Sequence, residues 1–156
     1  MTLTKVKRKN ENKNILTNTG KQNNSVIINF KFLDKCNISC FNSLSKFDKK
    51  NRERKVFTDL QHFLYESSSC KNMEDLISEY GSSKRTKMNS TNKYVKAIIN
   101  KFKMEYPDEK GLLSDGILHI HTKRKGNGKF VIFGVSWENV FYVLAFDPNH
   151  DFNKQI

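Results

Sequence analysis

Apolar and polar residues alternate through VIINFKFL, residues 26–33. The apolar positions that share one face of this segment are Val26, Ile28, Phe30 and Phe32. A period of two is typical of a strand with one buried face, so we predict the first strand here. The polar, Ser-rich and Cys-containing stretch that follows is interpreted as a connector.

The middle of the chain repeats its apolar residues at intervals of three and four, as on one face of a helix. Residues 51–68, 72–81 and 91–102 show this spacing. Asn72 can cap the second helix and Gly81 can end it. The third helix is basic and amphipathic, which suits contact with nucleic acid, a membrane surface or a partner; a lysine-rich solvated face is the plain alternative.

The last third of the chain returns to strand patterns. Residues 117–123, 129–135 and 139–146 are rich in β-branched and aromatic residues, and short hairpin segments join them. We therefore predict a two-layer α+β domain over residues 26–156. It has an N-terminal strand, two to three helices, and a C-terminal three-stranded antiparallel meander, with helices on one sheet face and the other face free for a ligand.

Charge and composition indicate which partners and which cellular location to expect. The chain has 156 residues and a formal net charge of +12, a field that concentrates nucleic acid or another polyanion, although an inert basic surface is the alternative. Residues 1–25 are interpreted as a disordered basic arm. No apolar run is long enough for a membrane span and no secretory leader is visible, so we expect a cytoplasmic protein. Three cysteines fit no zinc pattern.

Two histidines give the clearest chemical signal. His119 and His121 alternate with Leu118 and Ile120, so both imidazoles project from the same face of one strand. With the cations of the following hairpin, such a face suits phosphodiester chemistry, because a His transfers protons near neutral pH while cations hold the phosphate. The alternative is a pair of partly exposed histidines with no role.

The segment Asp147-Pro148-Asn149-His150 ends the last strand. Proline cannot extend a ladder, so a strand stop and an Asp-based turn explain these residues. His150 is then either a cover for the end of the sheet or a proton-transfer or phosphate-contacting group. Three imidazoles and Asp147 also suggest a metal site, but the spacing is a weak signal and the nearby cations oppose an ion. We therefore predict no metal and no cofactor.

The strand, helix and meander order, the cationic hairpin and the short tail resemble the RelE/ParE superfamily of bacterial toxins. The segment FGVSWENVFYVLAFDPNH is also similar to small accessory-gene proteins of bacteria. The superfamily resemblance implies a metal-independent endoribonuclease that attacks messenger RNA, often on the ribosome, or a gyrase-directed toxin, with a cognate antitoxin as partner. Positions that match its site pattern are Lys123, Arg124, Lys129, Tyr142 and His150. No Arg follows the last strand, and the basic helix and N-terminal arm are additions to the compact pattern.

The leading hypothesis is thus a toxin-like RNA-binding protein with endoribonuclease activity. The alternative is a non-catalytic nucleic-acid-binding or partner-binding protein of a mobile element, and an acidic antitoxin protein is the expected protein partner. The candidate catalytic residues are His119, His121, His150 and Tyr142. The candidate nucleic-acid-binding residues are Lys84, Arg85, Lys87, Lys93, Lys96, Lys123, Arg124 and Lys129.

Overall fold

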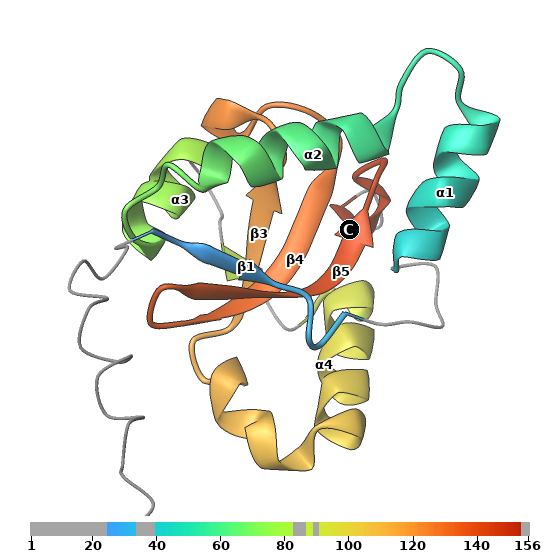
Figure 1. The fold of residues 1–156 in the computed structure, drawn as a ribbon. Helices are drawn as coiled ribbons and strands as arrows, with labels where there is room; N and C mark the ends of the chain where they lie inside the picture. Colours follow the sequence, from blue (N-terminus) through green and yellow to red (C-terminus); the bar gives the residue numbers. More distant parts are fainter. Residues whose placement is uncertain (1–24, 34–39, 83–86, 89–90, 154–156) are drawn as a thin grey trace, which may run out of the picture.

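The computed structural model describes residues 25–33, 40–82, 87–88 and 91–153 and confirms an α+β fold (Figure 1). In chain order the helices and strands are β1 (Ile27–Asn29), α1 (Phe41–Lys50), α2 (Val56–Ser67), α3 (Met73–Tyr80), β2 (Lys87–Met88), α4 (Lys93–Glu105), β3 (Ile117–His121), β4 (Val131–Trp137) and β5 (Val140–Asp147). Short 3-10 helices are η1 (Pro107–Leu113), η2 (Arg124–Gly126) and η3 (Asp151–Asn153).

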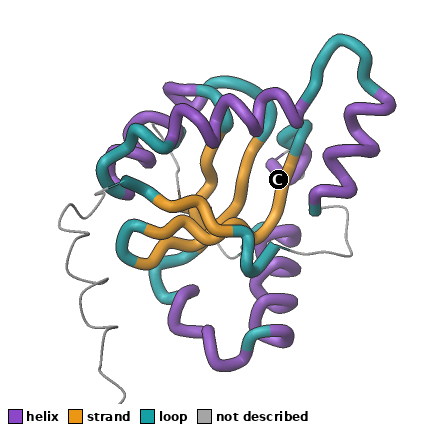
Figure 2. The backbone as a smooth tube through the Cα atoms, viewed as in Figure 1, coloured by secondary structure: helices purple, strands orange, loops and turns teal. Residues whose placement is uncertain are grey.

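The strands form one sheet in the order β1-β5-β4-β3-β2 (Figure 2). The β3, β4 and β5 strands pair antiparallel in succession, so the predicted meander lies at the centre of the sheet. The sheet is larger than predicted, because β1 adds parallel to β5 at one edge and β2 adds antiparallel to β3 at the other. The result is a mixed sheet.

Helices cover both faces of the sheet, which corrects the prediction of one open face. One core cluster joins Leu118 and Ile120 of β3 to residues of α1, α2 and α3. The second cluster joins Ile117 and Phe133 to residues of α4 and to Phe152 of η3. In Figure 1, α2 and α3 lie above the strands and α4 lies below them. Side chains of β3 point alternately to the two faces of the sheet, and both faces are buried. The alternating sequence pattern alone does not reveal that helices cover the second face as well.

The predicted helices at residues 51–68, 72–81 and 91–102 correspond to α2, α3 and α4, and the Asn72 side chain caps α3 through the Asp75 N–H. The α1 helix was not predicted, because its polar sequence buries only Leu44 among its ten residues. Asp48 of α1 accepts hydrogen bonds from the first N–H groups of α2, so the capping partner comes from outside α2. The described part therefore has four α-helices, one more than the upper expectation.

The β1 strand is shorter than the predicted segment at residues 26–33. The chain turns at Lys31, and the side chain of Asn29 accepts a hydrogen bond from the Lys31 N–H at 2.8 Å. Val26 and Phe30 consequently pack in the first cluster, whereas Phe32 packs in the second. The predicted common face for these residues is therefore wrong at Phe32.

Some predictions fall outside the described residues. These are the basic arm, for which Ser25 alone is described, and the side chains of Lys84, Arg85 and Lys87. Within the described part, no helix combines the length and the apolar character that crossing a bilayer requires.

Candidate functional site: a three-histidine cluster

Three of the four histidines in the chain come together on one side of the sheet. The Nε2 atoms of His119 and His150 lie 3.0 Å apart, and the two rings stack with centroids 5.0 Å apart. One ring nitrogen from each of His119, His121 and His150 lies within 4.8 Å of the others. His119 and His121 are only 3% and 4% exposed, and His150 is half-buried. The three imidazoles therefore form a compact cluster at the rim of the second core.

The β3 strand places two of these rings by its alternation. Since Leu118 and Ile120 enter the first core, His119 and His121 project to the opposite side, as the sequence predicts. His119 is held flat against Phe133 of β4, with ring centroids 5.5 Å apart. The two histidines share a face, but that face is buried rather than open.

The third histidine arrives because the chain folds back after β5. Both carboxylate oxygens of Asp147 accept backbone hydrogen bonds, from the N–H groups of Asp151 and Phe152, each at 2.9 Å. His150 adopts the left-handed conformation with a φ of 57°, which is uncommon for a residue other than glycine. Phe152 then packs against Phe133 at 5.2 Å between ring centroids. These contacts bring His150 over the sheet.

Asp147 is a buried structural carboxylate. Burial raises the pKa of the Asp147 carboxyl above its ordinary value, while the N–H groups of Phe152 and Asp151 and the charge of His150 act in the opposite direction. The predicted strand stop at Asp-Pro is confirmed, since β5 ends at Asp147. The sequence did not indicate that this carboxylate would bind the N–H groups that follow His150.

A backbone carbonyl fixes the tautomer of His121. Its Nδ1 lies 2.9 Å from the carbonyl oxygen of Gly128. A carbonyl oxygen can only accept, so Nδ1 carries the proton, and in the neutral ring Nε2 keeps its lone pair. Gly128 has a φ of 94°, a conformation that glycine reaches without strain, and this turns the hairpin towards His121.

The cations of the hairpin have carboxylate partners on α2 and α3. Arg124 lies 3.4 Å from Glu66 and 3.2 Å from Glu79, and the Tyr80 hydroxyl donates to Glu66 at 3.0 Å. Burial, together with the hydrogen bond to Glu66, raises the pKa of Tyr80 to about 12. Arg124 therefore forms its ion pairs with α2 and α3.

Lys123 has its Nζ 4.0 Å from Asp59 of α2. Lys129 is exposed and follows Gly128, whose carbonyl contacts His121. Lys123 and Arg124 thus face carboxylates, whereas Lys129 is exposed and is next in sequence to the residue whose carbonyl contacts His121.

The start of α4 lies beside the turn that carries His150. The Asn92 side chain caps α4 through the Tyr94 and Val95 N–H groups and also donates to the carbonyl oxygen of Phe152 at 2.8 Å. The Tyr94 ring stacks on the Phe152 ring at 4.5 Å, and the Lys93 Nζ lies 5.1 Å from the Tyr94 ring centroid. Lys93 and Lys96 are exposed. The basic helix therefore begins near the cluster, which the sequence did not reveal.

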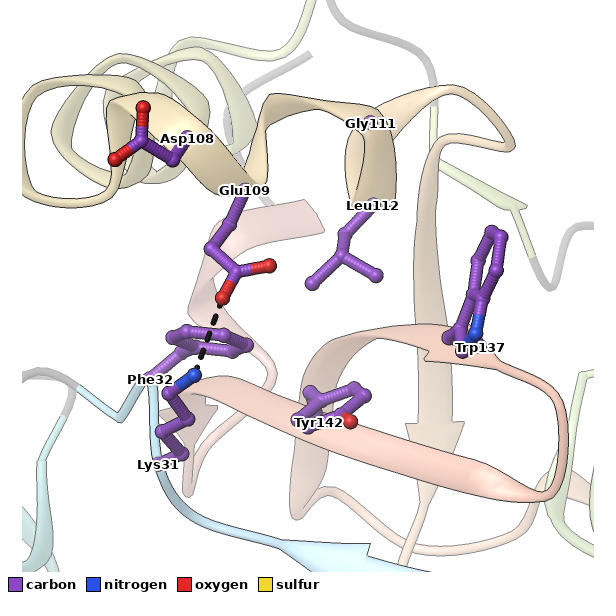
Figure 3. A pocket seen from close by; sticks show the side chains of 8 residues that line it. All are labelled: Lys31, Phe32, Asp108, Glu109, Gly111, Leu112, Trp137 and Tyr142. Atoms are coloured by element: carbon purple, nitrogen blue, oxygen red, sulfur yellow. Dashed lines mark hydrogen bonds and ion pairs between the residues drawn. The ribbon is translucent and has the colours of Figure 1, made fainter.

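Tyr142 does not join the histidines. It lies on β5 roughly 17 Å along the strand from Asp147. Its ring packs 5.2 Å from that of Phe32 and lines a separate cavity of about 290 Å³ together with exposed Trp137, as Figure 3 shows. Lys31 and Glu109 also line this cavity and form a salt bridge of 3.1 Å. The predicted catalytic set is thus divided between the two ends of the sheet.

Comparison of the chain with protein-family models, curated proteins and solved structures found no match. The resemblance to the RelE/ParE superfamily therefore stays a prediction. The chemistry of the cluster rests on its own geometry, which suits proton transfer between imidazoles or the coordination of a cation by imidazole nitrogens.

Proposed function

We propose that the protein binds RNA and cleaves it, with proton transfer at the His119 and His150 pair. The supporting observation is the 3.0 Å contact between their Nε2 atoms. Two ring nitrogens make such a hydrogen bond when one carries a proton and the other offers a lone pair. Because His150 is half-buried and His119 is buried, His150 is the member that meets substrate, and His119 orients it.

The proposed reaction is attack of a ribose 2′-oxygen on the adjacent phosphorus. His150 takes the proton of the 2′-hydroxyl, a bond forms between phosphorus and the 2′-oxygen, and the bond to the 5′-oxygen breaks. The leaving 5′-oxygen takes a proton from water, and the hydroxide left behind takes the proton from His150, which restores the neutral ring. The products are a 2′,3′-cyclic phosphate and a 5′-hydroxyl, and no redox step or metal is required.

Three exposed lysines support contact with the phosphate backbone. Lys93 and Lys96 lie on the first turn of α4 beside the His150 turn, and Lys129 adjoins the Gly128 carbonyl that binds His121. Their charge, within a net charge of +12, attracts RNA and stabilises negative charge that develops on the phosphate.

The test is incubation of purified protein with end-labelled RNA, with and without a chelator, followed by a denaturing gel. His150→Asn is the informative variant, because Asn tolerates the left-handed backbone of this position. The matched control is His62→Asn, which changes the exposed histidine on α2. We expect cleavage in chelator that His150→Asn lowers about 100-fold or more and His62→Asn leaves unchanged. Equal activity in the two variants would refute the proton-transfer role.

A second candidate is a non-catalytic RNA-binding protein. It is favoured by the burial of His119 and His121 and by the carboxylate partners of Lys123 and Arg124. Salt-sensitive RNA binding without cleavage under any condition would select it. An acidic partner protein, as the RelE/ParE resemblance implies, would bind the same lysines and displace RNA.

A further inference from the structure

We infer that His119, His121 and His150 form a binding site for one divalent transition-metal ion of the zinc class. The inference rests on the position and chemistry of the three rings and not on RNA cleavage. An ion held by His150 would occupy the lone pair that takes the proton in the proposed reaction, so the same ring cannot do both at once. Each ring offers one nitrogen, and the three nitrogens lie within 4.8 Å of one another.

The separations of the nitrogens approach those of a metal site. Imidazole nitrogens bind zinc at about 2.0–2.1 Å, so two ligands of a tetrahedral ion lie about 3.3 Å apart. The Nε2 atoms of His119 and His150 are 3.0 Å apart, and the three rings offer nitrogens within 4.8 Å. Binding of an ion would draw these nitrogens from separations of up to 4.8 Å towards about 3.3 Å, and they would then occupy three of the four tetrahedral positions.

The hydrogen bond of His121 is the kind that prepares an imidazole as a ligand. Metal-bound histidines usually donate their second ring N–H to a carbonyl or carboxylate, which fixes the tautomer and the ring direction. The Nδ1 of His121 does this with the Gly128 carbonyl at 2.9 Å, which leaves its Nε2 as the coordinating atom.

The surroundings keep the ligands in place. Phe133 stacks on His119, and Asp147 holds the backbone N–H groups of Asp151 and Phe152, which follow His150 directly. A preorganised, largely buried set of three imidazoles suits zinc, copper, nickel or cobalt ions better than magnesium or calcium, which prefer oxygen ligands. Three protein ligands leave the fourth position for water.

The positive hairpin does not oppose the ion as strongly as its sequence suggests. Lys123 and Arg124 pair with Asp59, Glu66 and Glu79, which belong to the helices of the other sheet face. The buried carboxyl group of Asp147 adds an acidic group on the side of His150. Lys123 and Arg124 are therefore partly neutralised and oppose an ion less than the hairpin sequence alone implies.

The experiment is titration of metal-free protein with Zn²⁺ by calorimetry and with Co²⁺ by visible absorption. We expect one ion per chain and the ligand-field bands of a four-coordinate Co²⁺ site. His150→Asn and His119→Phe remove a ligand, and Phe preserves the ring that packs on Phe133. Each should weaken Zn²⁺ binding at least 100-fold, whereas His62→Asn should bind like the parent protein. Circular dichroism checks that each variant is folded.

The readouts separate this inference from the proposed function. One bound ion without RNA cleavage would support the metal site and reject the nuclease. Cleavage in chelator with no Zn²⁺ binding would reject the metal site and support the nuclease. Zn²⁺ affinity that is unchanged in folded His150→Asn and His119→Phe would also overturn the site, as would an equal loss in His62→Asn.

Discussion

The Nε2 atoms of His119 and His150 lie 3.0 Å apart, although 31 positions separate the two residues in the sequence. A hydrogen bond between them requires a proton on one Nε2 and a lone pair on the other. When both rings are neutral, the donor is therefore the Nε2–H tautomer and the acceptor is the Nδ1–H tautomer. The contact thus makes the two histidines chemically different from each other.

Nitrogen-15 NMR of the histidine rings tests this difference. We expect His119 and His150 to show opposite neutral tautomers in metal-free protein, and His121 to show the Nδ1–H tautomer because of Gly128. Zn²⁺ should convert the donor ring of the pair, so that all three rings carry Nδ1–H. His62 serves as the internal control and should not respond. Identical tautomers for His119 and His150 without metal would contradict the contact.

Replacement of Asp147 by Asn should loosen the turn that carries His150. An amide offers one acceptor oxygen, so one of the N–H groups of Asp151 and Phe152 loses its partner. We expect a loss of about 1–3 kcal/mol in the free energy of unfolding and about 10–100-fold weaker Zn²⁺ binding, since a positioning group is lost. Urea unfolding and calorimetry measure these effects.

The control for Asp147 is Asp151→Asn in the same turn. Asp151 is exposed, and its carboxylate contacts the side chain of Asn149 at 3.3 Å. We expect small changes in stability and in metal affinity from this variant. Equal effects of the two substitutions would show that loss of charge, rather than loss of the backbone contacts, is responsible.

Gly134 should not tolerate a side chain. The register between β4 and β5 shifts between Phe133 and Gly134, and a Cβ at Gly134 would lie 2.5 Å from the carbonyl oxygen of Tyr142. Gly134→Ala should therefore destabilise the protein by about 1–3 kcal/mol. Gly111→Ala is the control, because no atom lies within 4 Å of its Cβ position. Similar urea midpoints for both variants would argue against this close packing.

Tyr80 should ionise only at strongly alkaline pH. Its pKa is raised to about 12 by burial and by Glu66, so folding favours the neutral phenol. This contribution to stability is fully present below pH 10 and is lost as the pH rises towards 12. Ultraviolet absorption of phenolate follows the titration. Tyr80→Phe should remove the late step and cost about 0.5–1.5 kcal/mol, whereas Tyr65→Phe, at an exposed position, should retain it.

Salt dependence should identify the lysines that contact RNA. If Lys93 and Lys96 each neutralise a phosphate, Lys93→Gln with Lys96→Gln should lower the slope of log affinity against log salt by about 1.4. Lys123→Gln with Arg124→Gln is the matched pair, and it should change the slope less because these cations face carboxylates. Filter binding over a range of salt concentrations measures both slopes, and the reverse order would assign the RNA to the hairpin.

The sequence by itself determined those features that depend on short-range periodicity. Alternation in β3 placed His119 and His121 on one face, and the Asp147-Pro148 pair ended β5 because proline has no N–H for the ladder. Apolar spacing located α2, α3 and α4, and hydrophobic strand patterns located the central meander. These signals are local because each arises from backbone geometry within a few residues.

Only the tertiary structure decided which surfaces are covered and which side chains meet. His150 reaches His119 because Phe152 packs on Phe133 and Tyr94, and the partners of Arg124 come from two distant helices. The α1 helix was not predicted because its sequence is mostly polar and only one of its residues is buried. Its Asp48 caps α2, and this contact also joins two separate elements. Such contacts depend on packing between segments far apart in the chain, and no periodicity within one segment records them.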